Sequence, residues 1–373
     1  MSSLIFLFFI ALFIIIELKV RSYMKRLLVF ALLPLVMTTT GCNQKNYFKL
    51  WNDCSSLRTL KEFVKDVTNK KSKNFIPVED RIATFDMDGT FIGELYPTYF
   101  EYNLLEYRAF DDPTYTNKDP YVVETAQDIR DFVRNGTPLP KYDEEFGFDI
   151  KHAHAAAKAY AGMTVAEFDK YVKDYAKKTA NGFTGMTYAE SFYKPMLEVF
   201  DYLRANDFTF YVVSGSDRFI CRSIVESIGI EPNRVIGMDV ELKSNEQGDT
   251  AGVNYTMEKE EYLVRTDNLL IKNLKTNKVK QIEQEIGKTP VLSFGNSSGD
   301  SAMHNFCMGN KQYRSEAFML IADDDEEDHI DPVETAKRKA NWEKANYNII
   351  SMKDDFKTIY GYNVKKTTSF IFE

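Results

Sequence analysis

Four short apolar runs, each followed directly by small or polar residues, constrain the fold of this chain of 373 residues more than any other feature. They span residues 81–85, 208–213, 290–294 and 317–322. Runs this short and this uniformly apolar are typical of parallel strands that are buried on both faces of a sheet. Because open α/β sheets bind ligands at their carboxyl edge, the residues that follow these runs are expected to line one site.

Helical patterns fill the segments between the runs and predict an α/β fold with a doubly wound, mostly parallel sheet. In the core they cover residues 57–67, 195–203, 217–228 and 274–286. Between the first and second runs they cover residues 122–134, 152–160 and 165–177. Capping boxes are predicted at Thr164 with Glu167 and at Thr187 with Glu190. The sequence therefore predicts a helical cap that is inserted after the first strand.

The predicted boundaries divide the chain into a leader, a tether, a core and a cap. The leader covers residues 1–42, the polar tether with a short helix 43–77, the core 78–92 and 193–373, and the cap 93–192. Within the core, residues 237–255 alternate around Gly248 and predict a small inserted β-hairpin.

The N-terminal residues have the pattern of a secretory signal. A basic start at 24–26 precedes an apolar stretch at 27–37 and small residues up to Cys42. The ending Gly41-Cys42 resembles a bacterial lipobox, with Thr39 where that pattern prefers Leu. The resemblance implies a lipid on Cys42, and hence a lipoprotein of the cell envelope that faces the periplasm. An uncleaved anchor helix is the alternative.

Charge and cysteine spacing exclude several classes of protein. The formal net charge is −8 and there is no dense stripe of Lys and Arg, which argues against a nucleic-acid partner. Besides Cys42, the chain has Cys54, Cys221 and Cys307 at irregular spacing. These three predict neither a disulfide framework nor a zinc site.

The segment Asp86-Met87-Asp88-Gly89-Thr90 follows the first run directly and carries two carboxylates two residues apart. Asp86 is placed to attack phosphorus and form a covalent intermediate. Asp88 is placed to protonate the leaving alkoxide and then to take a proton from water. Gly89 permits a tight turn, and we expect Gly89 and Thr90 to offer groups to phosphate oxygens.

Two further segments are expected to bind the phosphate. Ser214 and Gly215 follow the second run, where a hydroxyl can donate to a phosphoryl group. Lys278 lies near the start of the helix before the third run, where an ammonium can neutralise the phosphate and Asp86. The neighbouring lysines compete for this role; they are Lys272, Lys275 and Lys280.

The loop after the third run predicts a magnesium site. Asn296 and Asp300 bracket a loop that contains Gly299. Mg²⁺ takes about six oxygen ligands and keeps several waters. The chain's share is expected from Asp86, the backbone carbonyl of Asp88, and either Asn296 or Asp300.

Together these segments resemble the phosphatases of the haloacid dehalogenase superfamily, in particular a secreted branch similar to phosphoserine phosphatases. The branch is indicated by Trp51-Asn52-Asp53 and by the segments at 185–193 and 295–300. The resemblance implies a Rossmann-like core, a helical cap, Mg²⁺, and the residue roles given above. Many members have Asp where this chain has Asn296, so its site carries one negative charge fewer. Asp88 favours phosphoester cleavage, because dehalogenating members lack a carboxylate there.

The substrate is expected to be a small phosphorylated metabolite that is recognised by the cap. Glu94, Tyr96 and Tyr99 follow the first motif. An acid beside aromatic rings can bind a serine-like amine or a choline-like quaternary ammonium; packing of the cap against the core is the alternative. Two other functions keep the same fold: a phosphotransferase or mutase with the same intermediate, and a lipoprotein that binds ligands without catalysis.

Overall fold

The computed structural model describes residues 46–93, 98–324 and 332–367. Contacts divide the chain into two units, Met1–Asn46 and Tyr47–Glu373. The description below concerns the second unit, so the predicted leader and Cys42 lie outside the described residues. Within the described ranges, none of the helices has the length and apolar character that crossing a membrane requires.

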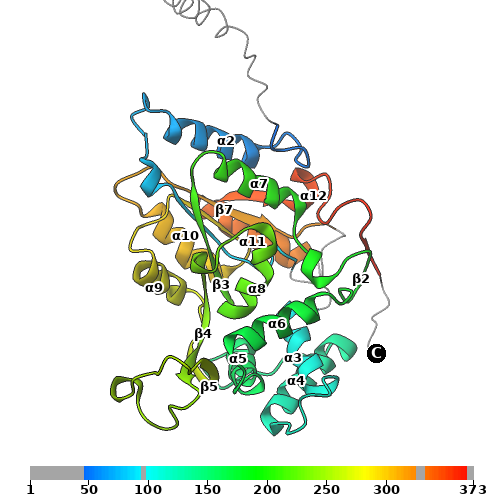
Figure 1. Cartoon of the computed structure of the whole chain (residues 1–373). Helices are drawn as coiled ribbons and strands as arrows, with labels where there is room; N and C mark the ends of the chain where they lie inside the picture. The colour runs from blue at the N-terminus through cyan, green and yellow to red at the C-terminus, as the bar shows by residue number, and fades with distance from the viewer. Residues whose placement is uncertain (1–45, 94–97, 325–331, 368–373) are drawn as a thin grey trace, which may run out of the picture. The chain divides into compact units, whose positions relative to one another are not determined.

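A seven-stranded sheet forms the core, in the order β5-β4-β3-β1-β6-β7-β8 (Figure 1). All neighbouring strands pair in parallel except β4 and β5. The strands are β1 Ile82–Phe85, β3 Thr209–Asp217, β4 Val235–Ser244, β5 Leu263–Ile271, β6 Leu292–Gly295, β7 Glu316–Ile321 and β8 Asn348–Ser351. This arrangement confirms the predicted fold class, and all four apolar runs are strands of this sheet.

Alternate residues along the strands supply two separate apolar layers, as the two-residue period of a strand requires. Val212 joins the main core cluster, whereas Val213 packs on the opposite face with Ile282. The main cluster contains a row of rings across three strands. Phe85 stacks on Phe294 with centroids 4.4 Å apart, and Phe294 stacks on Phe318 at 4.9 Å. Burial on both faces explains why these strands are apolar throughout.

Helices cover both faces of the sheet (Figure 1). Those of the core are α2 Ser55–Thr68, α7 Lys194–Arg204, α8 Arg218–Val225, α9 Thr276–Glu285, α10 Ser301–Met308, α11 Pro332–Lys344 and α12 Met352–Asp355. Those between β1 and β3 are α3 Phe100–Phe110, α4 Pro120–Asn135, α5 Phe148–Ala159 and α6 Val165–Ala176. The helix α3 was not predicted. The capping box of Thr164 begins α6 as predicted, and that of Thr187 begins the 3₁₀ turn Tyr188–Glu190.

The helical segment leaves and rejoins the core at one place. Ile92 and Phe192 form an antiparallel bridge, and the N–H of Gly93 donates to the carbonyl of Ser191 at 2.8 Å. A Cβ at Gly93 would lie 2.2 Å from the hydroxyl of Tyr360, so a larger residue here would require the buried ring of Tyr360 to shift. The boundaries of a separate cap domain at 93 and 192 remain a prediction.

The hairpin predicted at 237–255 was wrong in its extent. β4 continues the parallel sheet beside β3 and then pairs with β5, which begins only at Leu263. The turn residues around Gly248 begin a long connection instead of forming the tip of a tight hairpin. Figure 1 shows β5 beside α5. There Arg265 donates its N–H to Met163 at 2.9 Å and pairs with buried Asp217 at 2.5 Å, which ties the helical segment to the core.

Candidate active site

A pocket of about 370 Å³ lies where β1, β3 and β6 end. The predicted residues that line it are Asp86, Asp88, Tyr99, Ser214, Gly215, Lys278, Asn296 and Asp300. Gly89 and Thr90 do not line it, and Glu94 and Tyr96 lie outside the described residues. The parallel sheet brings these residues together because all three strands end at the same edge.

Lys278 joins two carboxylates at the base of this pocket. Its Nζ lies 2.6 Å from Oδ1 of Asp86 and 2.7 Å from Oδ1 of Asp300. All three residues are buried, with 1% of Lys278, 7% of Asp86 and 1% of Asp300 exposed. Charges removed from water need partners of opposite sign, so this triad fixes its members in place. Of the competing lysines, Lys272 and Lys275 line the pocket and Lys280 does not.

The two carboxylates of the triad differ in their surroundings. Burial raises the pKa of Asp86 to about 7, and the negative charge of Asp300 adds to this rise while Lys278 opposes it. Burial would also raise the pKa of Asp300, but Lys278 and a backbone N–H lower it. For Lys278, burial would lower the pKa, and the two carboxylates outweigh burial and raise it. Asp86 is therefore the carboxylate whose negative charge is least compensated by its neighbours.

Asp300 uses both of its oxygens within the protein. Oδ1 accepts from Lys278, and Oδ2 accepts from the N–H groups of Asn296 and Ser297, each at 3.1 Å. Asn296 lines the same pocket as Asp86. Its Oδ1 lies 3.5 Å from the hydroxyl of Thr90. This geometry favours Asn296 over Asp300 as a direct metal ligand.

The donors in the pocket fit a hard cation that keeps most of its waters. Asp86 is a carboxylate whose negative charge is only partly balanced by Lys278, and Asn296 offers an amide oxygen. Oxygen atoms are the ligands that Mg²⁺ prefers. Among the described residues, no three His, Cys, Asp or Glu side chains are arranged to hold a metal. A metal here would thus depend on Asp86, Asn296, a backbone carbonyl, water and phosphate oxygens.

Asp88 is held by a residue that the sequence analysis missed. The Oγ of Ser216 donates to Oδ2 of Asp88 at 2.8 Å, and the N–H of Ser216 donates to Oγ of Ser214 at 3.1 Å. Ser214 and Ser216 stand two positions apart on β3, and both line the pocket. That period of two was the signal that could have identified Ser216.

The turn after Asp88 is closed by its own backbone. Gly89 has a φ of 73°, which L side chains rarely adopt. The N–H of Gly89 donates to the carbonyl of Ile92 at 2.7 Å, and the N–H of Thr90 donates to the carbonyl of Met87 at 3.1 Å. These two amides already have partners within the turn. A role for Gly89 and Thr90 toward phosphate stays a prediction.

Gly215 allows a close approach between β3 and the loop before α9. A Cβ at Gly215 would lie 2.5 Å from a methyl group of Leu274. Asn273 precedes Leu274, and its side-chain amide donates to the backbone carbonyl of Ser214 at 3.0 Å. The loop that carries Lys272 and Lys275 into the pocket is thereby fixed to the end of β3.

The helical segment supplies the opposite wall of the pocket. Tyr99, Glu101 and Tyr102 come from the start of α3, and Asp149 comes from the first turn of α5. The hydroxyl of Tyr102 donates to Asp149 Oδ1 at 3.1 Å. Glu101 is buried and lies 3.3 Å from Nζ of Lys272. Sequence analysis missed Glu101 and Tyr102 because it did not predict the helix α3, and it missed Asp149 because it began the next helix only at residue 152.

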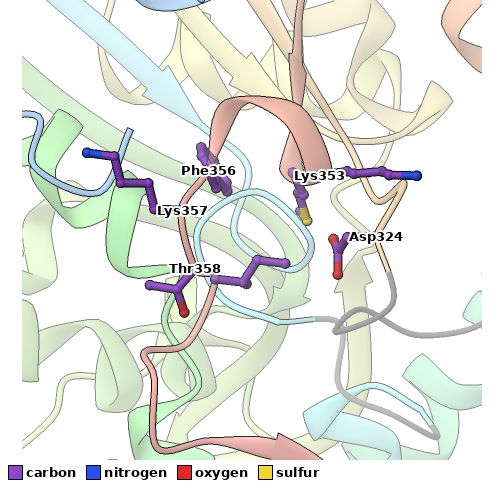
Figure 2. A pocket seen from close by; sticks show the side chains of 7 residues that line it. Asp324, Lys353, Phe356, Lys357 and Thr358 are labelled. Carbon is purple, nitrogen blue, oxygen red and sulfur yellow. The ribbon is translucent and has the colours of Figure 1, made fainter. Parts of the chain in front are cut away.

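Two other pockets contain none of the predicted site residues. One of about 240 Å³ is lined by the segment 352–359 and Asp324, and Figure 2 shows Lys357 pointing away from Asp324. The other, of about 1050 Å³, lies between the helices α3, α4 and α6 and the segment 178–184. Neither brings together a pair of carboxylates and a buried lysine.

Comparisons with known proteins give distant likenesses only. No protein-family model and no curated protein matches this chain. Among solved structures it is similar to a conserved functionally unknown protein from Anaerococcus prevotii, at 14% identity, covering 86% of this chain and 100% of that one, with a TM-score of 0.49.

Two hydrolases are among the other similar structures. One is a cytosolic 5′-nucleotidase IIIB bound to cytidine, at 12% identity, covering 83% of this chain and 88% of that one, with a TM-score of 0.45. The other is a phosphoserine phosphohydrolase-like protein from Francisella tularensis, at 12% identity, covering 64% and 87%, with a TM-score of 0.35. At TM-scores below 0.5 these likenesses carry no argument, and the site stands on its own geometry.

Proposed function

We propose that this protein is a magnesium-dependent phosphomonoester hydrolase of the haloacid dehalogenase type, which works through an aspartyl-phosphate on Asp86. The observation that carries the proposal is the buried contact of 2.6 Å between Asp86 and Lys278, in a pocket that also holds Asp88. A carboxylate nucleophile, an ammonium and a second carboxylate are the groups that phosphoryl transfer by this route requires.

In the first step a carboxylate oxygen of Asp86 attacks the phosphorus atom. The P–O bond to the alcohol breaks as the P–O bond to Asp86 forms, and Asp88 gives its proton to the departing oxygen. Lys278 and the hydroxyl of Ser214 stabilise the negative oxygens of the phosphoryl group. The alcohol leaves, Asp86 is phosphorylated, and Asp88 is a carboxylate.

In the second step Asp88 takes a proton from a water molecule while the water oxygen attacks phosphorus. The bond between phosphorus and Asp86 breaks, inorganic phosphate leaves, and both aspartates return to their starting states. Mg²⁺, held by Asp86, the backbone carbonyl of Asp88 and Asn296, would neutralise charge on the phosphoryl oxygens and orient them.

For the substrate we propose a small phosphate ester with a serine-like amine or a choline-like quaternary ammonium. A pocket of about 370 Å³ suits a small metabolite. The wall of the pocket that α3 and α5 supply, here called the cap wall, presents the carboxylate of Asp149 beside the rings of Tyr99 and Tyr102. The centroids of these two rings lie 5.2 Å apart. A carboxylate beside aromatic rings attracts a cation. Asp149 thus supplies the negative charge that the sequence analysis assigned to Glu94.

A hydrolysis assay tests the proposed reaction. With Mg²⁺, purified protein should release phosphate from p-nitrophenyl phosphate, and Asp86→Asn should lower kcat by about a thousandfold or more, because it removes the nucleophile. Asp174→Asn is the control, since Asp174 lies on the cap surface, where it pairs with Lys170. Turnover retained in Asp86→Asn would rule out the aspartyl-phosphate.

For the N-terminus we propose a lipid on Cys42 and a location in the cell envelope, facing the periplasm. The support is the signal pattern that ends at Cys42. Mass spectrometry of the membrane fraction should find a mature chain that begins with a lipid-modified Cys42. A mature chain with an unmodified Cys42 would contradict this proposal.

A further inference from the structure

We infer that Ser216 is a positioning residue for Asp88, and that it orients this carboxyl group for proton transfer to the leaving oxygen. The inference rests on the proposed function. It is supported by the hydrogen bond of 2.8 Å that Oγ of Ser216 donates to Oδ2 of Asp88. Ser216 is 7% exposed and lines the pocket beside Asp88.

Ser216 is itself fixed by its surroundings. Its N–H donates to Oγ of Ser214, and the register of β3 against β4 shifts between Val213 and Asp217. On its other side the backbone of β4 approaches closely: a Cβ at Gly237 would lie 2.8 Å from the carbonyl oxygen of Ser216. The hydroxyl therefore projects from a rigid strand end, which is what orienting a second side chain requires.

The chemistry of a hydroxyl suits the two tasks of Asp88. An acid and base must be protonated in one step and ionised in the next. A hydroxyl can donate to a carboxylate and accept from a carboxylic acid, so Ser216 can remain bonded to either form. An ammonium, such as the one that Lys278 presents to Asp86, can only donate and favours the ionised form.

The orientation of Asp88 matters most for substrates whose leaving oxygen is strongly basic. Such an oxygen needs the proton from Asp88 as its bond to phosphorus breaks, whereas a p-nitrophenolate leaves with little help. Loss of Ser216 should therefore penalise esters in proportion to the basicity of their leaving group. A residue that serves only to stabilise the fold would lower the rates of all esters alike.

The experiment compares Ser216→Ala with the unaltered protein on substituted phenyl phosphates of similar size. General acid catalysis contributes about 10²–10⁴-fold. We expect Ser216→Ala to lower kcat/KM for phenyl phosphate by about tenfold and for p-nitrophenyl phosphate by less than about threefold, as a partial loss of that contribution. Ser216→Thr, which keeps the hydroxyl, should restore most of the rate on phenyl phosphate.

A matched control comes from the other end of the core. Ser56 is buried and donates its Oγ to Oδ2 of Asp355 at 2.6 Å, so Ser56→Ala removes the same kind of bond away from the pocket. It should leave the dependence on the leaving group unchanged. Equal losses on all esters in Ser216→Ala, or no rescue by Ser216→Thr, would overturn the inference alone. Absence of hydrolysis by the unaltered protein would overturn the proposed function and this inference with it.

Discussion

The two ends of the pocket differ in how deeply their charged and polar side chains are buried. At the end for which we propose phosphate binding, here called the phosphate end, Lys278, Asp86 and Asp300 are buried charges that hold one another at 2.6 and 2.7 Å. At the cap end Asp149 is exposed and Tyr99 is 36% exposed. The first arrangement is rigid because no member can move without leaving a buried charge unpaired. The second is open to solvent, which suits recognition of a substrate that must enter and leave.

This contrast implies that substitutions at the phosphate end affect the rate of reaction and the stability together. At the cap end they should mainly affect which ester is preferred.

Lys278→Met should have the largest effect. It leaves two buried carboxylates facing each other, so kcat/KM should fall by about 10²–10³-fold. The free energy of unfolding should fall by about 3–5 kcal/mol, because one partner of buried ion pairs is lost. Phosphate release and urea unfolding measure the two losses. Lys280→Met is the matched control, because Lys280 is exposed on the same helix; similar losses in both variants would contradict the assigned role.

Asn296 should control the metal requirement. Asn296→Ala should raise the Mg²⁺ concentration for half-maximal activity by about 10–100-fold, as is usual for disrupted metal sites. Asn296→Asp should lower that concentration, because it adds a negative charge. In Asp300→Asn turnover should fall with a smaller change in the Mg²⁺ requirement, since Asp300 bonds to Lys278 and to backbone N–H groups. A larger shift in Asp300→Asn than in Asn296→Ala would reverse this assignment.

Asp149→Asn should have the smallest effect, and only on selectivity. An ion pair between an exposed carboxylate and a cation is worth up to about 1 kcal/mol, so the KM for phosphocholine should rise by up to about fivefold relative to that for p-nitrophenyl phosphate. Glu144→Gln, on an exposed residue before α5, should leave the ratio of the two KM values unchanged. If Asp149→Asn also leaves this ratio unchanged, the cap wall does not recognise a cation.

Several errors of sequence analysis have a physical cause in the fold. The strand β8 was not predicted, and β5 was placed too early. Both are edge strands of the sheet, and partly exposed strands lack the uniform apolar pattern of buried ones.

The sequence by itself determined the four central strands and the residues that follow them. Position after a buried parallel strand is a local property of the chain, and such residues must meet at the sheet's carboxyl edge. That is why the order of residues alone assigns Asp86, Asp88, Ser214 and the Asn296–Asp300 loop to one site.

Only the tertiary structure decided how these residues are paired. The contact of Ser216 with Asp88 joins positions 128 residues apart, and that of Lys272 with Glu101 joins positions 171 apart. No local pattern encodes such pairs, because they depend on how the sheet is assembled and how the helical segment packs against it. The same packing placed Asp149 in the wall of the pocket and joined Asp300 to Lys278.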